Sequence, residues 1–420
     1  MNTFLKNLFY QTNSNQKYSL VLLLLLPIIF ILGNLTINLL FFFLSIIFIA
    51  ELLKNKNFHF VKDPIFLLLI FFFITLLINL FFSSNPTNSS TRILKLILII
   101  MSIFQIKNIF FNNEKKFENI ILNFWSIIFV ILIFDIIFEL IFGFNTLGFK
   151  SYIPARIASF FNEELIVGSF FLGFGLIFFS HFIKNYKDKK ILTFIILLLL
   201  ITISLLIGER SNFLKFLFGI SLISLIILRP KIKNIIITIS LIATIIFSLI
   251  YFDKSTALKH RYFTFFLNKN DQKLNIQKFY KNSLYGAHQN AAYKIFQNYP
   301  LFGIGVKNFR LESSKLKYKN DEYHWTNNRW STHPHQIHFE FLAETGLFGY
   351  LSFLIFISAS LILSLKNYFK NKNYIQLSCI AYILTSLIPF VPSGSFFTTF
   401  SSGLFWINYA IMVSYNKNYN

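Results

Sequence analysis

Repeated long apolar runs set the strongest limit on how this chain of 420 residues folds. A run of about 20 apolar residues spans the hydrocarbon core of a bilayer as an α-helix. Backbone groups inside a bilayer have no water to bond, so runs of this length indicate helices. Twelve runs qualify, and they begin near Leu20, Leu35, Pro64, Ile93, Ile120, Phe161, Ile191, Asn212, Asn234, Gln336, Tyr374 and Phe396. The sequence therefore predicts an all-α polytopic membrane protein with about 12 transmembrane helices.

The number of lysines and arginines is alternately high and low in successive connections, as expected for twelve spans. One set of connections holds 19 of the 39 Lys and Arg residues, and the short connections of the other set hold 6. The remaining 14 lie in residues 253–335, and long loops cross a membrane largely regardless of charge. Because cytoplasmic loops carry the excess of positive charge, both termini are predicted to be cytoplasmic. The large loop between spans 9 and 10 is then extracytoplasmic.

This topology divides the chain into three parts. Residues 1–252 are expected to form transmembrane helices 1–9, residues 253–335 the large outer loop with short helices, and residues 336–420 helices 10–12. The net charge of +22 does not indicate nucleic-acid binding. Nucleic-acid-binding proteins gather basic residues on a soluble face, whereas most of these residues lie between apolar runs. We therefore expect the lipid bilayer, and no nucleic acid, among the partners.

Polar residues able to carry out chemistry concentrate on the predicted outer face. The large loop ends in Ser331-Thr-His-Pro-His-Gln-Ile-His338, and His335 and His338 are expected to share one face of a new helix. Three interpretations remain open. The histidines are solvated residues at a loop-to-helix junction, or His333, His335 and His338 supply three nitrogen ligands to a metal ion. Alternatively, one is a general base, since an unperturbed imidazole pKa of about 6.5 suits deprotonation of a hydroxyl.

Two arginines occupy similar positions in successive outer connections. Arg210 lies in Gly208-Glu-Arg-Ser-Asn-Phe-Leu214, a polar break between two apolar runs, and Arg156 lies one outer loop earlier. Each is either an ordinary charge at the edge of the membrane or a phosphate ligand that faces the bundle interior. A guanidinium suits the second role because it is always charged and binds phosphate through two parallel hydrogen bonds.

A third stretch, from His288 to Arg310, reads as an amphipathic helix that Pro300 ends, followed by a turn with Gly303-Ile-Gly305. This glycine pair is too short and too badly placed for a nucleotide-binding fingerprint. An outer loop would also meet little nucleotide. No nucleotide cofactor is therefore expected.

Together these motifs resemble those of the O-antigen ligase and polymerase family of membrane glycan transferases. The shared elements are a Pro-Leu-Phe-Gly-x-Gly turn at 300–305, His-Pro-His-Gln at 333–336 and Glu-x-Gly-x-x-Gly at 344–349. His335 with Gln336, nine residues, Gly346, two residues and Gly349 fits the histidine motif of the family, with Gln in place of the usual Asn.

The arginines extend this resemblance and also depart from it. Arg210 with Leu214 fits the family's arginine-x-x-x-leucine motif, and Arg156 before Ser159-Phe-Phe-Asn-Glu fits a looser arginine element. Similar ligases carry a second arginine in the large loop, upstream of the histidine. Here His288 stands near that place, and the other arginines of the loop are Arg261, Arg310 and Arg329.

The resemblance implies a glycosyltransferase of lipopolysaccharide or surface polysaccharide assembly. Such an enzyme takes a glycan from an undecaprenyl-type diphosphate donor and attaches it to a sugar hydroxyl of a lipid-linked acceptor, lipid A-core or a growing glycan. It would lie in the bacterial inner membrane with its active site facing the periplasm. His335 would deprotonate the acceptor and Arg210 would stabilise the leaving diphosphate. Further contacts to the diphosphate or the glycan would come from Arg156, His288, Arg310, His333 and His338.

The resemblance further implies inversion in one displacement, without a metal or another cofactor. Within the family, the alternative to a ligase is a polymerase, which uses the growing glycan as acceptor. An alternative of another class is a transporter or flippase for lipid-linked sugars. Transporters usually show repeated halves and intramembrane charge. Asp135 and Glu139 lie four residues apart in one apolar run, but no internal repeat is evident.

Overall fold

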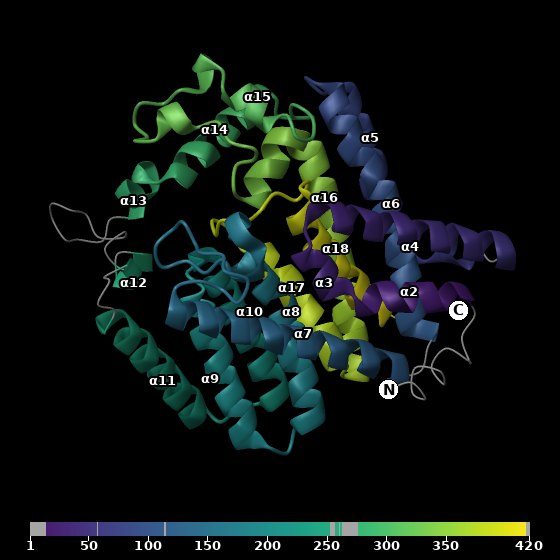
Figure 1. The fold of residues 1–420 in the computed structure, drawn as a ribbon. Helices are drawn as coiled ribbons and strands as arrows, with labels where there is room; N and C mark the ends of the chain where they lie inside the picture. Colours follow the sequence, from purple (N-terminus) through teal and green to yellow (C-terminus); the bar gives the residue numbers. More distant parts are fainter. Residues whose placement is uncertain are drawn as a thin grey trace.

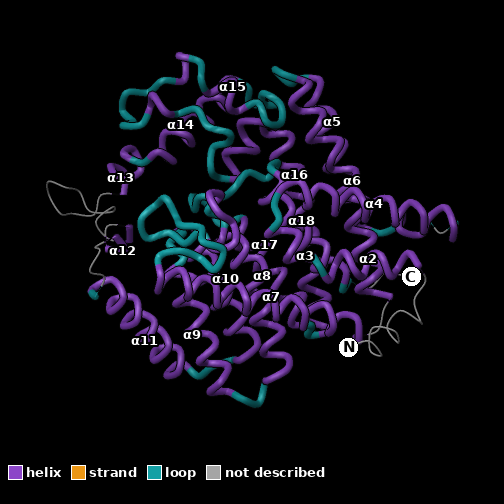
Figure 2. Tube along the Cα trace, viewed as in Figure 1, coloured by secondary structure: helices purple, strands orange, loops and turns teal. Residues whose placement is uncertain are grey.

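The protein is helical in all regular elements described by a computed structural model (Figures 1 and 2). The described residues are 14–56, 58–112, 115–252, 257–259, 261–262 and 276–416, and no strand occurs in these ranges. The predicted all-α class is thus confirmed. The predicted cytoplasmic placement of the termini concerns residues 1–13 and 417–420, which lie outside the described residues, as do 253–256, 260 and 263–275 of the predicted outer loop.

Each apolar run predicted to be a span contains helix. Within the described ranges, eight helices are long and apolar enough to cross a membrane: α4 (Asn34–Asn55), α5 (Pro64–Phe81), α6 (Pro86–Asn112), α7 (Lys115–Phe142), α8 (Val167–Tyr186), α10 (Arg210–Leu228), α11 (Ile232–Tyr251) and α16 (Ile337–Asn371). The other runs form shorter helices: α2 (Ser14–Leu24), α3 (Leu26–Ile31), α9 (Lys190–Leu206), α17 (Tyr374–Ser386) and α18 (Thr399–Ser414). A polytopic membrane protein is therefore supported, while the number of twelve spans stays a prediction.

The C-terminal helices form the centre of the bundle (Figure 1). Helix α17 packs against α18, α8 and α10, α18 also packs against α6, and α16 packs against α5. Nearly every residue of α17 and α18 is buried. Helix α11 differs, because Ile250 is its single buried residue and apolar side chains cover most of its length. An apolar helix with so much exposed surface is suited to contact with lipid.

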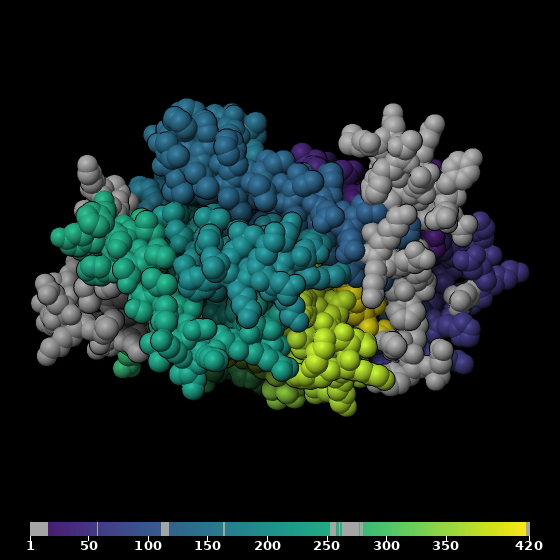
Figure 3. Space-filling model, turned by 90° about the horizontal axis from the view of Figure 1, so that it is seen from below, coloured from purple at the N-terminus to yellow at the C-terminus, as the bar shows by residue number. Residues whose placement is uncertain are grey.

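Two connections at one end of the bundle carry the polar motifs. The connection between α7 and α8 contains the 3₁₀ helix η2 (Ser159–Glu164). The end of α7 and this connection have the blue colour of the region that stands out at the top of Figure 3. Between α11 and α16, the described part forms α12 (Ala257–Lys259), α13 (Ile276–Asn282), α14 (Leu284–Asn298), α15 (Phe309–Ser313) and the 3₁₀ turns η4 (Leu316–Tyr318) and η5 (Thr326–Asn328). Helix α14 ends just before Pro300, and it packs against α16.

The two glycine motifs of the sequence are the two sides of one contact. Helix α16 is interrupted at Gly346, whose φ is 63° and ψ −168°. The 300–305 turn enters this interruption, where the backbone N–H of Gly305 donates to the Glu344 carbonyl at 2.8 Å and that of Leu347 donates to the Pro300 carbonyl at 2.8 Å. These bonds satisfy backbone groups that the break in the helix would otherwise leave unpaired. The contact fixes the outer segment on α16.

Candidate active site

Two acidic side chains of α7 hold the connection that carries Arg156. Glu139 accepts hydrogen bonds from the backbone N–H groups of Ala158, at 2.9 Å, and Ser159, at 2.6 Å. Asp135 accepts a bond from the Ser159 hydroxyl at 2.7 Å. Both carboxylates are buried. The charges that the transporter interpretation would place on a translocation path are therefore used to brace a loop.

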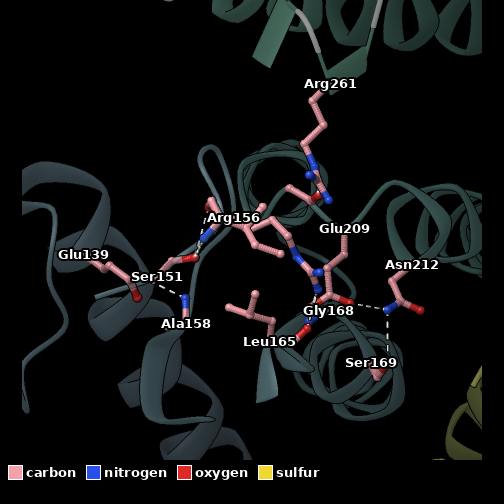
Figure 4. Close-up of polar contacts among 12 residues, drawn as sticks. Glu139, Ser151, Arg156, Ala158, Leu165, Gly168, Ser169, Glu209, Asn212 and Arg261 are labelled. Carbon is pink, nitrogen blue, oxygen red and sulfur yellow. Dashed lines mark hydrogen bonds and ion pairs between the residues drawn. The ribbon is translucent and has the colours of Figure 1, made fainter. Parts of the chain in front are cut away.

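Arg156 is tied to the turn between α9 and α10 (Figure 4). Its guanidinium donates to the Leu165 carbonyl and forms an ion pair with Glu209, with 3.3 Å between Arg156 Nη2 and Glu209 Oε1. Glu209 also accepts bonds from the backbone N–H of Gly168, at 3.0 Å, and from the side chain of Asn212, at 2.5 Å. Burial raises the pKa of Glu209, and the charge of Arg156 opposes that shift.

Gly208 allows these two loops to meet. Its φ is +78°, and a Cβ atom at this position would lie 1.8 Å from the Ala155 carbonyl oxygen. Glycine is required there for both reasons, because it accepts a left-handed backbone and has no Cβ. The turn brings Arg210, at the start of α10, close to the loop of Arg156.

A third guanidinium reaches the same turn from the segment after α11. Arg261 donates to the carbonyl of Gly208, and Arg210 Nη1 donates to the carbonyl of Arg261 at 3.2 Å. Figure 4 shows the Arg261 side chain extending toward Arg156 and Glu209. Burial, followed by the charges of Arg156 and Arg210, lowers the pKa of Arg261 to about 10. We call Arg156, Arg210 and Arg261 the arginine cluster, in which Arg156 forms an ion pair with Glu209.

Three imidazoles gather just before α16. The ring centroid of His335 lies 4.1 Å from that of His333 and 5.2 Å from that of His288, and the His288 and His335 planes are inclined by 23°. His335 has a left-handed backbone, with φ 57°, and the Ser393 N–H donates to its carbonyl at 2.9 Å. The Ser331 hydroxyl lies 3.2 Å from His335 Nε2. We call these three rings the histidine cluster.

Burial makes the imidazoles of the histidine cluster weak bases. It lowers the pKa of His335 to about 4, with a smaller contribution from His288, and it lowers the pKa of His333 well below the usual value. Burial lowers the pKa of His288 as well. All three are therefore neutral at pH 7 and able to accept a proton, although His335 is less basic than the value of about 6.5 expected from sequence. A nearby anion would raise its pKa.

Tyr285 of α14 lies close to both clusters. Its ring centroid lies 5.1 Å from that of His335. The same side chain lies within electrostatic range of the Arg210 guanidinium. An imidazole and guanidinium groups thus lie in one region. Arg210 comes from the start of α10, and His335 comes from the residues before α16. This arrangement can bind an anion beside a proton acceptor.

The expectation that His335 and His338 share a helix face is wrong. The Gln336 side chain caps α16 by accepting a bond from the Phe339 N–H at 3.0 Å, so the helix begins at Ile337, after His335. His338 turns away to a structural role, with Nε2 donating to the Leu387 carbonyl at 2.8 Å and Nδ1 accepting from the Tyr350 hydroxyl at 3.0 Å. The two residues therefore do not share a helix face.

The proposed metal site is not formed either. Both ring nitrogens of His338 are engaged, so it cannot complete a set of ligands with His333 and His335. Among the described residues, no group of three or more His, Cys, Asp or Glu side chains is arranged to hold a metal ion. The general-base interpretation of His335 is the one that the geometry favours.

The remaining candidates divide between the clusters and the surface. His288 belongs to the histidine cluster, where its Nε2 donates to the Asn328 carbonyl at 3.0 Å. Arg310 lies on α15 with its side chain exposed, and its assignment as a substrate contact stays a prediction. Arg329 is buried and donates to the carbonyls of Ser314 and Lys315, which explains it as a structural residue.

A buried hydrogen-bond network packs next to the histidine cluster. Lys307 Nζ donates to the Thr332 carbonyl at 3.2 Å and to the Ser395 hydroxyl at 3.3 Å, and the Ser395 hydroxyl donates to Glu340. The Lys307 backbone N–H donates to Glu344 at 2.7 Å. Both carboxylates are fully buried. Sequence reasoning missed Lys307 and Tyr285, because neither belongs to a spacing pattern that indicates chemistry.

The fold and these clusters define a class of protein: a multi-pass membrane protein whose cationic and imidazole groups meet at one end of the helical bundle. Residues 194–354 match the family model described as O-antigen ligase. The match begins in α9, includes Arg210, Arg261 and the histidine cluster, and ends in α16. No curated protein matches the chain. The predicted resemblance to the O-antigen ligase family is therefore confirmed, and it supports a membrane glycosyltransferase-like enzyme of surface polysaccharide assembly.

Proposed function

We propose that this protein transfers a glycan from an undecaprenyl-type diphosphate donor to a sugar hydroxyl of a lipid-linked acceptor, as an O-antigen ligase. One observation carries the proposal: Tyr285 lies against the ring of His335 and within electrostatic range of Arg210 in the arginine cluster. The donor presents a diphosphate and the acceptor presents a hydroxyl. Their reaction requires cations for the leaving group and a base for the hydroxyl proton.

In the proposed reaction, Arg156, Arg210 and Arg261 hold the diphosphate. The acceptor oxygen forms a bond to the anomeric carbon of the donor while the bond to the diphosphate breaks, and the diphosphate leaves with the electron pair. Negative charge develops on the leaving oxygen, where the guanidinium groups stabilise it. His335 takes the proton from the acceptor hydroxyl. A single displacement inverts the anomeric configuration and requires neither a metal nor a nucleotide.

Binding of the donor would strengthen this base. The diphosphate brings negative charge to the arginine cluster, and an anion near His335 favours the protonated imidazole. The pKa of about 4 in the free protein would then rise toward the working pH. The base would become effective when its donor is in place.

The exposed apolar surface of α11 supports a lipid-linked donor. Ile250 is the single buried residue of this helix, so its other apolar side chains are available to a prenyl chain. Leu205 lies where α9 packs beside α11, and its carbonyl accepts a hydrogen bond from Tyr262 at 2.8 Å, next in sequence to Arg261. A prenyl chain along α11 would have its diphosphate near the arginine cluster. The acceptor, lipid A-core or a growing glycan, would approach from the histidine cluster.

The proposed location is the bacterial inner membrane, with both termini in the cytoplasm and the clusters facing the periplasm. The support is the distribution of charge, because the Lys- and Arg-rich short connections lie on the side away from the clusters. The α8–α9 turn, with Lys184, Lys187, Lys189 and Lys190, is one of these connections.

Deletion of the gene tests the proposal and separates a ligase from a polymerase. Loss of a ligase leaves long glycans on the prenyl carrier and none on the lipid anchor. Loss of a polymerase leaves single repeat units on the anchor. Wild-type surface glycans in the deletion strain, with no glycan retained on the carrier, would contradict both. Complementation with His335→Ala, checked for membrane insertion, tests the role of the site.

A further inference from the structure

A cavity of about 60 Å³, lined by both polar and apolar side chains, lies between the two clusters. On one side it is bounded by Asn212, whose amide binds Glu209 of the arginine cluster turn. On the other side it is bounded by Ser393, whose N–H binds the carbonyl of His335. Its walls come from α8, α10, α17 and α18, from the start of α16 and from the connection between α17 and α18.

Lys215 of α10 lines this cavity, and the mechanism proposed above does not use it. Its side chain is 4% exposed. Within the described part of the chain, no hydrogen bond or ion pair engages its ammonium group, and no carboxylate is among the residues that line the cavity. Burying an ammonium without a partner is costly, so such a group indicates a missing anionic ligand.

Ser393 provides a second and independent indication. Its hydroxyl is buried and has no hydrogen-bond partner among the described residues. Buried hydroxyls are normally paired, and an orphan that borders a cavity is a candidate ligand contact. Ser169, Tyr382 and Ser401 place further hydroxyl groups on the lining. The donors of Asn212, Ser386 and Ser395 are already engaged, with Ser169 and Glu209, with the Tyr382 carbonyl and with Glu340.

One cation beside several hydroxyl groups suits an oxyanion, because each oxygen can accept several hydrogen bonds. The cavity is larger than the roughly 10–15 Å³ that a single water needs, and it can accommodate a compact group. An apolar ligand would leave the ammonium and the hydroxyls unpaired. A cation would be repelled by Lys215.

We propose that this cavity is an oxyanion site in which Lys215 and Ser393 bind a phosphoryl group. The chemistry is shared by a phosphoryl group of a prenyl diphosphate and by free phosphate. The first source rests on the proposed function, and the second does not. Occupancy of the site would bear on His335, because Ser393 binds the anion through its hydroxyl and the His335 carbonyl through its N–H.

Thermal unfolding of the purified full-length protein in detergent tests this site, with inorganic phosphate and farnesyl diphosphate as probes and chloride at equal ionic strength as the reference. Lys215→Met removes the charge and keeps the chain length. Lys187→Met, at an exposed lysine, is the matched control. Phosphate should stabilise the wild type and Lys187→Met. Lys215→Met should require at least about tenfold more phosphate for the same stabilisation, because it removes the charged hydrogen-bond donor.

Stability without phosphate provides a second measurement. Lys215→Met should be at least as stable as the wild type in chloride, because it removes an unpaired buried charge. Ser393→Ala should weaken phosphate binding severalfold. Equal phosphate responses in the wild type and Lys215→Met, or no specific response in the wild type, would overturn the proposal.

The two probes distinguish the sources of the anion. Weaker farnesyl diphosphate binding in Lys215→Met would assign the site to the donor. A loss restricted to inorganic phosphate would assign it to a free oxyanion. His335→Ala should bind phosphate as the wild type does, even though it should not transfer glycan. Loss of the glycan-transfer hypothesis would therefore leave this result intact.

Discussion

Gly303 and Gly346 approach so closely that neither position accommodates a side chain. A Cβ atom on Gly303 would lie 2.6 Å from the backbone nitrogen of Gly346, and a Cβ atom on Gly346 would lie 2.6 Å from the backbone nitrogen of Gly303. Both residues have a positive φ. The glycines recognised in the sequence as separate motifs are therefore matched across one contact between the outer segment and α16.

Gly346→Ala is expected to destabilise the protein by roughly 2 kcal/mol or more, because it adds a steric clash to backbone strain. Thermal unfolding in detergent measures the effect. Gly33→Ala is the matched control, since Gly33 has φ +99° with no atom near the added Cβ. Equal losses of stability in the two variants would contradict the importance of the contact.

His335→Ala is expected to abolish glycan transfer while the protein still inserts and folds. The physical reason is the loss of the proton acceptor, a contribution of about 10²–10⁴ in rate. Transfer between purified donor and acceptor measures it. His324→Ala, at an exposed histidine of the same outer segment, should retain activity. Near wild-type transfer by His335→Ala would show that another group is the base.

Replacing each member of the arginine cluster by lysine is expected to reduce transfer by about tenfold or more, because a lysine cannot form two parallel bonds to a phosphate. Arg210→Lys and Arg261→Lys test this directly, with catalytic rates measured at saturating donor. Arg310→Lys serves as the comparison, since Arg310 is exposed on α15. A loss confined to Arg310→Lys would move the diphosphate site to the outer segment.

The pH dependence of transfer should show the lowered pKa of His335. In the free protein this pKa is about 4, so kcat/KM should stay level from pH 7 down to about 5 and fall below it as the imidazole becomes protonated. The acid limb of kcat should lie at higher pH, because the bound diphosphate raises the same pKa. Coincident limbs in the two profiles would argue against contact between the diphosphate and His335.

The free energy of unfolding should also decrease as the pH is lowered, because the imidazoles of the histidine cluster have lowered pKa values. The folded state holds His288, His333 and His335 with lowered pKa values, so the unfolded state binds more protons below the usual value of about 6.5. The stability contributed by the neutral rings is present above pH 6.5 and is lost as the pH falls toward 4. His333→Phe should weaken this dependence, as unfolding at several pH values would reveal.

The helices and the family could be predicted because run length and motif spacing are local in the sequence. Twelve apolar runs are long enough to require helix, and His335 with Gly346 and Gly349 keeps a fixed spacing. The start of α16 could not be placed in this way. Gln caps helices less often than Ser, Thr, Asp or Asn, so Gln336 gave no clear signal, and the predicted shared face of His335 and His338 was wrong.

The features of the site that the sequence did not predict depend on contacts between segments that are distant in the chain. Arg261 lies 51 residues after Arg210, and nothing in its own sequence indicates that it donates to Gly208. The sequence indicated an ordinary pKa for His335. The burial that lowers this pKa depends on how distant segments pack, so the sequence does not show it. In the sequence, Asp135 and Glu139 are two acidic residues in an apolar run, which is compatible with a transporter. Their hydrogen bonds to the loop after α7 become apparent only in the folded chain.

The brace formed by Asp135 and Glu139 bears on how enzymes of this kind can be recombined. These carboxylates precede residues 194–354, and so does the Arg156 that they help to hold against Glu209. A chimera that exchanged only residues 194–354 with those of a relative would pair two independently evolved halves of the proposed diphosphate site. Exchange of donor preference between relatives is therefore expected to succeed when the end of α7 and its following loop travel with that segment.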